Sequence, residues 1–424
     1  MTRPLRFCML TTFYPPWSFG GDAIQVQRLS HALVERGHEV VVVHSPEAYK
    51  ALARRPPAAA EDAKVRTVPI DAGLGKLSPV ATYLSGRPLL TSRKLERALA
   101  EDFDVLHFHN PSLLGGPALL RMGRGVKLYT LHEQWLVCPT HVLWKYRKRV
   151  CEKPDCWRCT ATYHRPPQPW RETGLLERCV RQLDALIAPS RSSAALHERF
   201  ADMTRIEHLG NFLSDPEPDV DSAPPVEPQQ RPYFLFAGRL EPVKGVDRLI
   251  EAFRRRRSED LLIAGTGTLE QQLRTQGRDL EHVRFLGWLE PRELERLYRR
   301  ALAVVVPTLG HESFPLVLLE AFARSCPAVV HDFGALAELA AESGAALTYS
   351  SGSELDAALA RIAADGDLRR ELGARGRAAY LERWTPEAHL SRYFGLIEER
   401  ARERGEGELA AAASAARGRV RDGT

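Results

Sequence analysis

Long hydrophobic runs are missing from this chain of 424 residues. No apolar stretch approaches the roughly 18–20 residues that a membrane-spanning helix needs. The apolar run near the N-terminus is short, is interrupted by threonines and stops at Pro15-Pro16, which does not fit a secretory signal peptide. The sequence therefore predicts a cytoplasmic protein.

Lysine is also scarce, because only nine of the 59 basic residues are Lys and the others are Arg. With 54 acidic residues, the formal net charge is only +5. This small and diffuse excess suits an anionic small ligand and at most a peripheral contact with an anionic membrane. It predicts no nucleic-acid partner. The composition, 44% hydrophobic and 27% charged, excludes disorder as the main state.

Short apolar strands alternate with helical patterns along most of the chain. The strand candidates are Leu5–Leu10, Glu39–His44, Val65–Ile70, Val105–His109, Lys127–Leu131, Ala185–Ala188, Tyr233–Ala237, Leu261–Ala264, Val283–Leu286, Ala303–Val306, Ala328–His331 and Ala346–Thr348. Repeated strand–helix units predict an α/β fold with parallel sheets covered by helices. The chain length predicts two such domains.

A Pro-rich, acidic segment at 214–232 interrupts this pattern and has the composition of a linker. It divides a first Rossmann-like domain, 1–213, from a second, 233–385. We expect the helical segment 386–402 to pack back on the first domain. The low-complexity segment 403–424 is predicted to be a tail that is disordered or only partly helical.

Ligands of doubly wound sheets bind outside the carboxyl ends of the strands, so the loops that follow strands are the expected positions of ligand-binding residues. After the strand at 233–237, Gly238 permits a turn, and Arg239 and Lys244 precede a helix. Two cations beside a helix N-terminus form an anion site. The alternative is a pair of solvated surface cations.

The segment HESFPLVLLEA, 311–321, follows another strand and opens another helix. Ser313 is a candidate N-cap, and Pro315 is tolerated in a first turn. Glu312 and Glu320 could grip hydroxyl groups on either side of a pyrophosphate. The alternative is one capping acid and one surface acid. The residues that flank Glu320 are apolar, however, and a carboxylate among them favours a functional role.

Further candidates lie after other strands. Gly20 and Gly21 precede a helix N-terminus, where backbone can approach a phosphate or an acceptor, and Asp22 is a candidate N-cap of that helix. His132 follows the strand at 127–131. Two alternatives are open for the Gly265-Thr266-Gly267 turn. It either lies beside the anion site of Arg239 and Lys244 or is only a tight turn.

These motifs together resemble the retaining GT-B glycosyltransferases of family four, the glycosyl transferases of group 1. The motifs that carry the resemblance are, in order, Gly20-Gly21, His132, Gly238-Arg239-Leu240…Lys244-Gly245 and Glu312…Glu320. The resemblance covers about residues 5–400. The chain departs from the family at Pro315, where the family usually has Gly, and Pro has no N–H to offer a phosphate.

The resemblance implies a role for each position. Arg239 and Lys244 would neutralise the donor pyrophosphate, Glu312 would contact the donor sugar, and Glu320 would accept hydrogen bonds from the ribose. The implied catalytic set is Glu312, His132, Arg239 and Lys244. The implied donor-binding set is Gly20, Gly21, Gly238, Arg239, Lys244, Gly265, Gly287, Trp288, Ser313, Phe314, Leu316, Val317 and Glu320.

The resemblance also implies the fold and the reaction. The fold is GT-B, with an acceptor-side domain and a nucleotide-sugar-binding domain facing a central cleft. A sugar would pass from a nucleotide diphosphate donor to a hydroxyl of a saccharide, lipid-linked or secondary-metabolite acceptor, with retention and without a catalytic metal. The alternatives are a nucleotide-sugar epimerase or phosphorylase on the same fold, or a nucleic-acid-binding protein that uses a Cys/Arg-rich insert.

That insert, about 138–172, contains four of the seven cysteines: Cys138, Cys151, Cys156 and Cys159. Their spacing, with a closing C-x-x-C, is compatible with tetrahedral zinc. Such a zinc would be structural, because four thiolates leave no open position. Free reduced thiols are the alternative.

Overall fold

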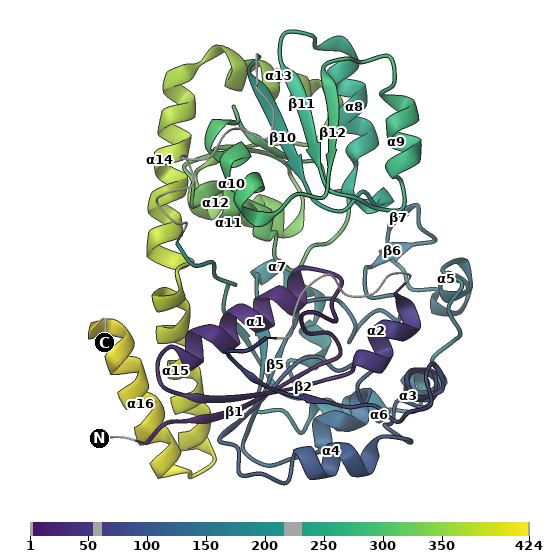
Figure 1. Cartoon of the computed structure of the whole chain (residues 1–424), viewed down its shortest axis with the longest axis vertical. Helices are drawn as coiled ribbons and strands as arrows, with labels where there is room; N and C mark the ends of the chain where they lie inside the picture. Colours follow the sequence, from purple (N-terminus) through teal and green to yellow (C-terminus); the bar gives the residue numbers. More distant parts are fainter. Residues whose placement is uncertain (1–2, 54–61, 216–230, 423–424) are drawn as a thin grey trace. The chain divides into compact units, whose positions relative to one another are not determined.

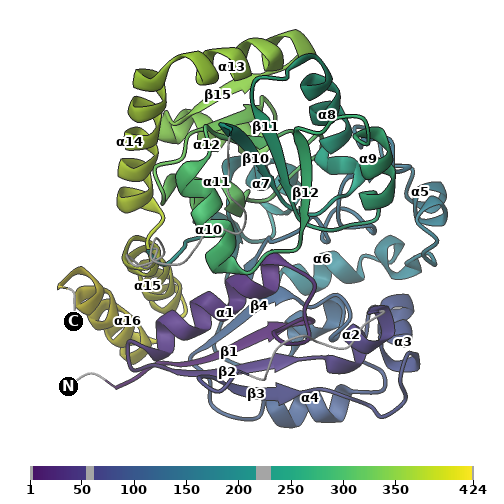
Figure 2. The same cartoon turned by 45° about the horizontal axis from the view of Figure 1, so that its top comes forward.

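The computed structural model describes residues 3–53, 62–215 and 231–422. The chain forms two compact units (Figures 1 and 2). The first unit contains residues 1–141, 156–211 and 386–424, and the second contains 142–155 and 212–385. The segment 386–424 thus belongs to the first unit. Most of the expected linker, 216–230, lies outside the described residues.

The first unit is built on a seven-stranded sheet in the order β3-β2-β1-β4-β5-β8-β9. All of its pairings are parallel. Its strands are β1 (Arg6–Thr11), β2 (Glu39–His44), β3 (Arg66–Pro69), β4 (Val105–Asn110), β5 (Val126–Thr130), β8 (Ala185–Ala188) and β9 (Arg205–His208). The short strand β9 was not among the sequence candidates.

Helices pack around this sheet, and Figure 1 shows α1 crossing beside β1 and β2. The helices of the first unit are α1 (Gly21–Val34), α2 (Pro46–Leu52), α3 (Leu77–Ser85), α4 (Ser92–Ala98), α5 (Cys156–Thr162), α6 (Leu175–Val180), α7 (Arg191–Leu196), α15 (Pro386–Glu403) and α16 (Gly407–Asp422). Three 3₁₀ turns, η1 (Pro117–Arg121), η2 (Pro169–Glu172) and η3 (Glu198–Phe200), join them.

The second unit has a six-stranded parallel sheet in the order β12-β11-β10-β13-β14-β15. Its strands are β10 (Tyr233–Ala237), β11 (Asp260–Ala264), β12 (Val283–Gly287), β13 (Val304–Val306), β14 (Ala328–His331) and β15 (Ala346–Tyr349). Its helices are α8 (Val246–Arg255), α9 (Glu270–Gln276), α10 (Pro291–Arg300), α11 (Leu316–Phe322), α12 (Gly334–Ser343), α13 (Gly352–Ala364) and α14 (Gly366–Arg383), with the 3₁₀ turn η5 (Pro242–Lys244).

Strand β10 shows why these apolar runs form central strands. Its side chains alternate between two cores: Tyr233 and Leu235 join one, and Phe234 and Phe236 join the other. Each of the four is at most 2% exposed. Burial of such a side chain contributes roughly 1.5–3 kcal/mol, so a run that is apolar on both faces is stable only inside a sheet covered on both faces. The predicted α/β class is confirmed.

Each sheet has one point where the strand order changes direction. In the first unit it lies between β1 and β4, and in the second between β10 and β13. Loops leave the sheet in opposite directions on the two sides of such a point, which leaves a crevice at the carboxyl ends of the strands. The loops after β10 and β13 are those that carry Arg239, Lys244 and Glu312.

Two local expectations were wrong, and for a third the structure favours one of its two alternatives. The segment 403–424 is not an unstructured tail, since its alanines form α16 and several of them pack against α15, where Ala413 and Ala416 are almost fully buried. Alanine has the highest helix propensity, and its small side chain permits close helix packing. Asp22 does not cap α1, because the N-cap is Gly20 and Asp22 lies in the first turn. Ser313 does not cap α11, which begins after Pro315.

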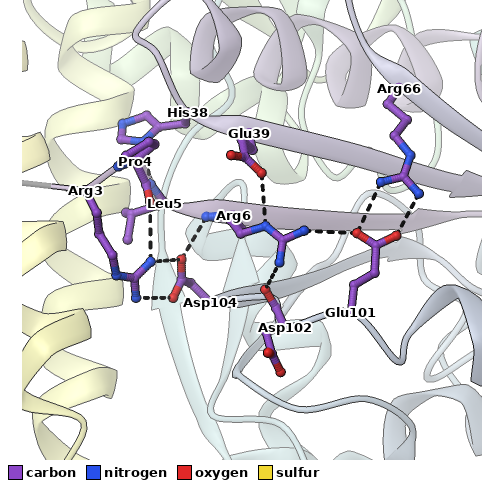
Figure 3. A network of polar contacts seen from close by, with 10 residues as sticks. All are labelled: Arg3, Pro4, Leu5, Arg6, His38, Glu39, Arg66, Glu101, Asp102 and Asp104. Atoms are coloured by element: carbon purple, nitrogen blue, oxygen red, sulfur yellow. Dashed lines mark hydrogen bonds and ion pairs between the residues drawn. The ribbon is translucent and has the colours of Figure 1, made fainter.

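Ion pairs tie the amino ends of the first unit's strands together (Figure 3). Arg6 on β1 contacts Glu39 on β2 and Glu101 at 3.0 Å each, and Arg66 on β3 contacts Glu101 at 2.7 Å. Asp104 accepts the backbone N–H of Arg6 at 2.8 Å. The network connects β1, β2 and β3 near their amino ends. The loops expected to bind ligands follow the carboxyl ends of the strands.

We expect Glu101→Gln to lower the free energy of unfolding at neutral pH by about 1 kcal/mol or less, because the pair is partly exposed. The hydrogen bond from Arg66 holds the pKa of Glu101 below its ordinary value, against a smaller opposing effect of burial. The stabilisation is therefore complete above the ordinary pKa and is lost as the pH falls through the lower pKa of the folded protein. Urea unfolding at several pH values measures it.

The control is Glu96→Gln, since Glu96 accepts a hydrogen bond from Ser92 and is exposed. A stability difference for Glu101→Gln that persists undiminished at the most acidic pH where the protein still folds would contradict this assignment.

Candidate functional site

Lys244 is positioned by a short turn with a strict steric requirement. It ends η5, and the next residue, Gly245, adopts φ +67° and is the N-cap of α8. A Cβ at Gly245 would lie 2.3 Å from the carbonyl oxygen of Pro307, at the end of β13. Only glycine therefore allows the loop after β10 to contact the loop after β13.

Glu312 lies in that second loop, and its carboxylate contacts Lys244. The Nζ atom of Lys244 donates to Oε1 of Glu312 at 2.7 Å, and the two side chains are 24% and 15% exposed. Leu309 N–H donates to the carbonyl of Val243 at 2.8 Å, which joins the two loops beside the ion pair. The structure thus brings together two residues that are 68 positions apart.

The electrostatic surroundings keep Glu312 ionised. Burial alone would raise its pKa, but the charge and hydrogen bond of Lys244 outweigh it, and the net pKa lies below the ordinary value. Thr308 and the charge of Arg239 lower the pKa further. Arg239 itself is exposed in the loop after β10. Arg239, Lys244 and Glu312 therefore form one electrostatic group, in which Thr308 was not anticipated from the sequence.

A small hairpin from the Cys-rich insert also supports these loops. Strands β6 (Trp144–Lys145) and β7 (Arg149–Val150) pair antiparallel and belong to the second unit. A Cβ at Gly310 would lie 2.4 Å from Val243 and 3.3 Å from the ring of Trp144. This contact could not be predicted from the sequence, since two-residue strands carry no periodic pattern.

Glycines also fix the neighbouring loops of the second unit. Gly238 N–H donates to Ala264 at 3.0 Å, Leu240 N–H to Thr266 at 2.9 Å, and Gly265 N–H to Gly287 at 2.6 Å. A Cβ at Gly265, where φ is +133°, would lie 1.9 Å from the carbonyl oxygen of Gly238. The Gly265 turn is thus packed directly against the Arg239 loop.

We expect Gly265→Ala to destabilise the protein and to weaken any ligand binding that depends on the Arg239 loop. The positive φ alone costs about 1–3 kcal/mol for a residue with a Cβ, and the clash with backbone adds to it. Thermal unfolding followed by circular dichroism measures the loss. Gly352→Ala is the matched control, because a Cβ at Gly352 meets nothing within 4 Å and its φ is not positive; equal effects of the two changes would contradict the packing argument.

Glu320 is held by a partner on another helix. Tyr298 of α10 donates its hydroxyl to Oε2 of Glu320 on α11 at 3.0 Å. Burial, together with the Glu320 charge, raises the pKa of Tyr298 well above its ordinary value, so the phenol keeps its proton. The contact orients the half-buried carboxylate of Glu320, and no sequence motif pointed to Tyr298.

The remaining predicted donor-binding residues of the second unit lie around the start of α11 and after β12. Ser313 is buried, Phe314 and Val317 pack partly against the core, and Leu316 begins α11. The first N–H groups of a helix have no acceptor within it, which leaves the amides of Leu316 and Val317 available in principle to an anion. Trp288, directly after β12, is 66% exposed.

His132 lies in the first unit, just after β5, and faces a second histidine. Its Nε2 is 2.9 Å from Nδ1 of His109, and the rings stack with centroids 5.1 Å apart. Burial lowers the pKa of His132 to about 4, against the opposing charge of Asp22, and lowers that of His109 well below its ordinary value. Both rings are neutral at pH 7.

The histidine contacts continue into the unit. The His107 ring is 4.0 Å from that of His109, and its nitrogens contact Thr130 at 2.7 Å and the Tyr393 hydroxyl of α15 at 2.9 Å. A cavity of about 20 Å³, room for about one water, lies among these side chains and His389. The segment after residue 385 therefore contributes to the surroundings of His132, which the sequence did not reveal.

The double glycine starts α1 in the first unit. Gly20 is extended, with φ 172°, and Gly21 is the first helical residue. Asp22 approaches Asn110, at the end of β4, with an Nδ2–Oδ2 distance of 3.5 Å. These residues lie at the β1/β4 change of strand order, so they are placed as ligand-binding residues of a doubly wound sheet usually are.

The structure does not show the predicted zinc site. No group of three or more His, Cys, Asp or Glu side chains within the described part of the chain is placed to hold a metal ion. Cys151 belongs to the second unit, whereas Cys138, Cys156 and Cys159 belong to the first. None of the seven cysteines forms a disulfide, and Cys8, Cys179 and Cys326 are buried core residues.

Solved structures share this architecture. A sucrose-phosphate synthase from Thermosynechococcus elongatus matches with a TM-score of 0.69 at 18% identity, over 93% of this chain and 98% of that one. Anabaena Alr3699/HepE in complex with UDP-glucose matches with a TM-score of 0.63 at 15% identity, over 95% and 100%. The fold is therefore the GT-B glycosyltransferase fold.

Sequence comparisons define the family. The family described as Glycosyltransferase Family 4 matches residues 19–214, and that described as Glycosyl transferases group 1 matches residues 219–379. The chain belongs to this family of glycosyltransferases.

Two relatives illustrate its range. A phosphatidyl-myo-inositol mannosyltransferase of Mycolicibacterium smegmatis is 27% identical over 381 residues, covering 85% of this chain and 86% of the relative. A glycogen synthase of Mycobacterium tuberculosis is 28% identical over 357 residues, covering 79% and 80%.

Among the described residues, no helix is both long enough and apolar enough to span a bilayer.

Proposed function

We propose that the protein transfers a sugar from a nucleoside diphosphate sugar to an acceptor hydroxyl with retention of configuration. The observation that carries the proposal is the Lys244–Glu312 pair with Arg239 beside it, at the β10/β13 change of strand order. The relative Alr3699/HepE, solved with UDP-glucose, supports a nucleotide sugar as donor. The named relatives support a saccharide or lipid-linked acceptor.

The chemistry follows from charge. When the bond between the anomeric carbon and the phosphate oxygen breaks, negative charge develops on the diphosphate. Arg239 and Lys244, preorganised by the glycine-dependent loops, would stabilise that charge without a metal ion. Lys244 would then share its N–H groups between the phosphate and Glu312, and the ionised Glu312 would lie beside the positive charge that builds on the sugar.

Retention is proposed because the assigned residues offer no strong base. Glu312 has a pKa below its ordinary value, and His132 has a pKa of about 4. An inverting transferase needs a base that takes the acceptor proton as the hydroxyl attacks from the opposite face. In the proposed reaction the acceptor oxygen bonds to the anomeric carbon on the leaving-group face, and the departing phosphate oxygen receives the acceptor proton.

We expect Arg239→Ala and Lys244→Met each to weaken binding of a nucleoside diphosphate at least about tenfold and to change nucleoside binding little. A hydrogen bond to a charged group is worth about 1.5–3 kcal/mol, which corresponds to that factor. Calorimetric titration with UDP, GDP and dTDP against the matching nucleosides measures the difference and shows which base is preferred. Arg248→Ala, an exposed arginine on α8, is the matched control.

Lys244→Met leaves the carboxylate of Glu312 without its partner and should also lower stability. The double variant Lys244→Met/Glu312→Gln removes both charges and should recover stability but not diphosphate affinity. Recovery of affinity together with stability, or equal losses for diphosphate and nucleoside, would refute the pyrophosphate assignment.

We expect an α-linked nucleotide sugar to give an α-linked product. Proton NMR of the first product, before any anomeric equilibration, reads the configuration directly. Glu312→Gln and His132→Ala should lower kcat more than they raise KM, because their contacts should strengthen as charge builds on the sugar. A β-linked first product would show that the retaining mechanism is wrong, even if the donor assignment holds.

A further inference from the structure

Helix α3 of the first unit has its apolar side turned to solvent. Leu77, Val80 and Leu84, spaced as neighbours on one helical face, are 66%, 47% and 40% exposed. The opposite face buries Ser78 and Thr82 instead, at 5% and 2% exposure. A surface helix of a soluble protein normally shows the reverse arrangement, so this helix presents an apolar stripe that nothing in its own unit covers among the described residues.

The loops on either side extend this apolar surface. Leu74 before the helix is 49% exposed, and Leu89 and Leu90 after it are 60% and 47% exposed. Six of the eleven exposed large hydrophobic side chains in the described part of the chain thus fall within residues 74–90. We call Leu74, Leu77, Val80, Leu84, Leu89 and Leu90 the α3 patch.

The α3 patch is fixed in place before the helix begins. The buried carboxylate of Glu47 accepts the backbone N–H groups of Ala72 and Leu74, each at 3.0 Å. These hydrogen bonds fix the backbone at Leu74, whose side chain is 49% exposed.

The helix itself is fixed by Trp170 of η2. The indole N–H of Trp170 donates to the carbonyl of Tyr83 at 2.9 Å. A Cβ at Gly86, the C-cap of α3 with φ +68°, would lie 2.9 Å from the Trp170 ring. Helix α3 therefore cannot rotate to bury its leucines without breaking these contacts, and the exposure is built into the fold. Figures 1 and 2 show α3 at the outside of the first unit in both views.

Basic side chains outnumber acidic ones around the α3 patch, where the carboxylates of Asp71 and Glu96 lie just outside its two ends in the sequence. Residues 72–95 contain Lys76, Arg87, Arg93 and Lys94 and no Asp or Glu. All four basic side chains are exposed. An apolar stripe bordered by cations has the character of a surface that binds an anionic membrane interface.

We propose that the α3 patch docks the protein on the surface of an anionic lipid bilayer, with the leucines and Val80 in the headgroup region and the four cations against lipid phosphates. The charge pattern selects this occupant over a second copy of the chain. A two-fold interface would place the same basic border against itself, and like charges repel.

Vesicle flotation of the full chain, without donor or acceptor, tests the proposal. The protein should float with vesicles of phosphatidylcholine and phosphatidylglycerol in equal parts and much less with pure phosphatidylcholine. Raised salt should weaken the binding, because the charge contribution is screened. Leu77→Ser should lower the partition coefficient about tenfold, whereas the matched control Leu381→Ser, 49% exposed on α14 of the other unit, should not change it.

The charge half of the proposal has its own variants. Arg87→Gln and Arg93→Gln should each lower binding to the anionic vesicles about fivefold, whereas Arg361→Gln, an exposed arginine on α13, should have no effect. Because all these side chains are exposed, thermal unfolding of each variant should match that of the parent protein, which keeps the comparison independent of folding.

Three outcomes would overturn the proposal. The first is failure of the parent protein to float with anionic vesicles. The second is equal flotation of the triple variant Leu77→Ser/Val80→Ser/Leu84→Ser. The third is a parent dimer in sedimentation equilibrium that becomes a monomer in the triple variant, which would assign the α3 patch to a second copy. None of these depends on sugar transfer, so the proposed function stands or falls separately.

Discussion

The second unit depends on keeping one buried carboxylate paired. Glu312 is mostly removed from water, and an unpaired ion in that position would cost several kcal/mol. Lys244 meets it at 2.7 Å, and the charge of Arg239 adds to the same effect. The pair exists only because the loops after β10 and β13 touch, and they touch only because Gly245 has no Cβ to collide with Pro307. A single glycine thus supports both the stability of the unit and the site that we propose for the diphosphate.

The adjacent loops of the second unit also depend on glycines that permit close backbone contact. Gly238, Gly265 and Gly287 are joined by direct backbone hydrogen bonds or carbonyl contacts, so the loops after β10, β11 and β12 form one layer. A layer held by backbone groups is rigid without large side chains above it. Arg239 and Trp288, in the loops that follow β10 and β12, are exposed.

Much of this could be predicted from the sequence because burial on both faces of a parallel sheet leaves a clear apolar run. Strands such as Glu39–His44 and Ala328–His331 were predicted at their observed bounds. The order of the strands is carried by no local pattern, so the contact of Lys244 with Glu312 was expected only in general terms. The partner Tyr298 was missed for the same reason, since it meets the carboxylate of Glu320 through the fold and not through spacing.

Local composition was a poor guide to structure in two segments. The alanine-rich C-terminal segment was predicted to be disordered or only partly helical, yet its small side chains suit close packing of α16 on α15. The four cysteines looked organised enough to bind a metal, yet the fold assigns Cys151 to a different unit from the other three. The hairpin β6–β7 belongs to the second unit, where it packs Trp144 beside Gly310.

The two units differ in whether the burial of an ionisable group is compensated by nearby charge, and this difference bears on the proposed reaction. In the second unit the burial of Glu312 is compensated by cations, so the carboxylate stays ionised. In the first unit burial of His132 among His109 and its neighbours is not compensated, so the imidazole stays neutral. A neutral imidazole with a pKa of about 4 can hold a hydroxyl group by a hydrogen bond, but it is a poor acceptor for the proton of an attacking alcohol at neutral pH. The group whose basicity rises during the reaction is the departing phosphate, because it gains charge as the glycosidic bond breaks. In the reaction that we propose, proton transfer to that oxygen would accompany bond formation on the same face of the sugar, and retention of configuration would follow.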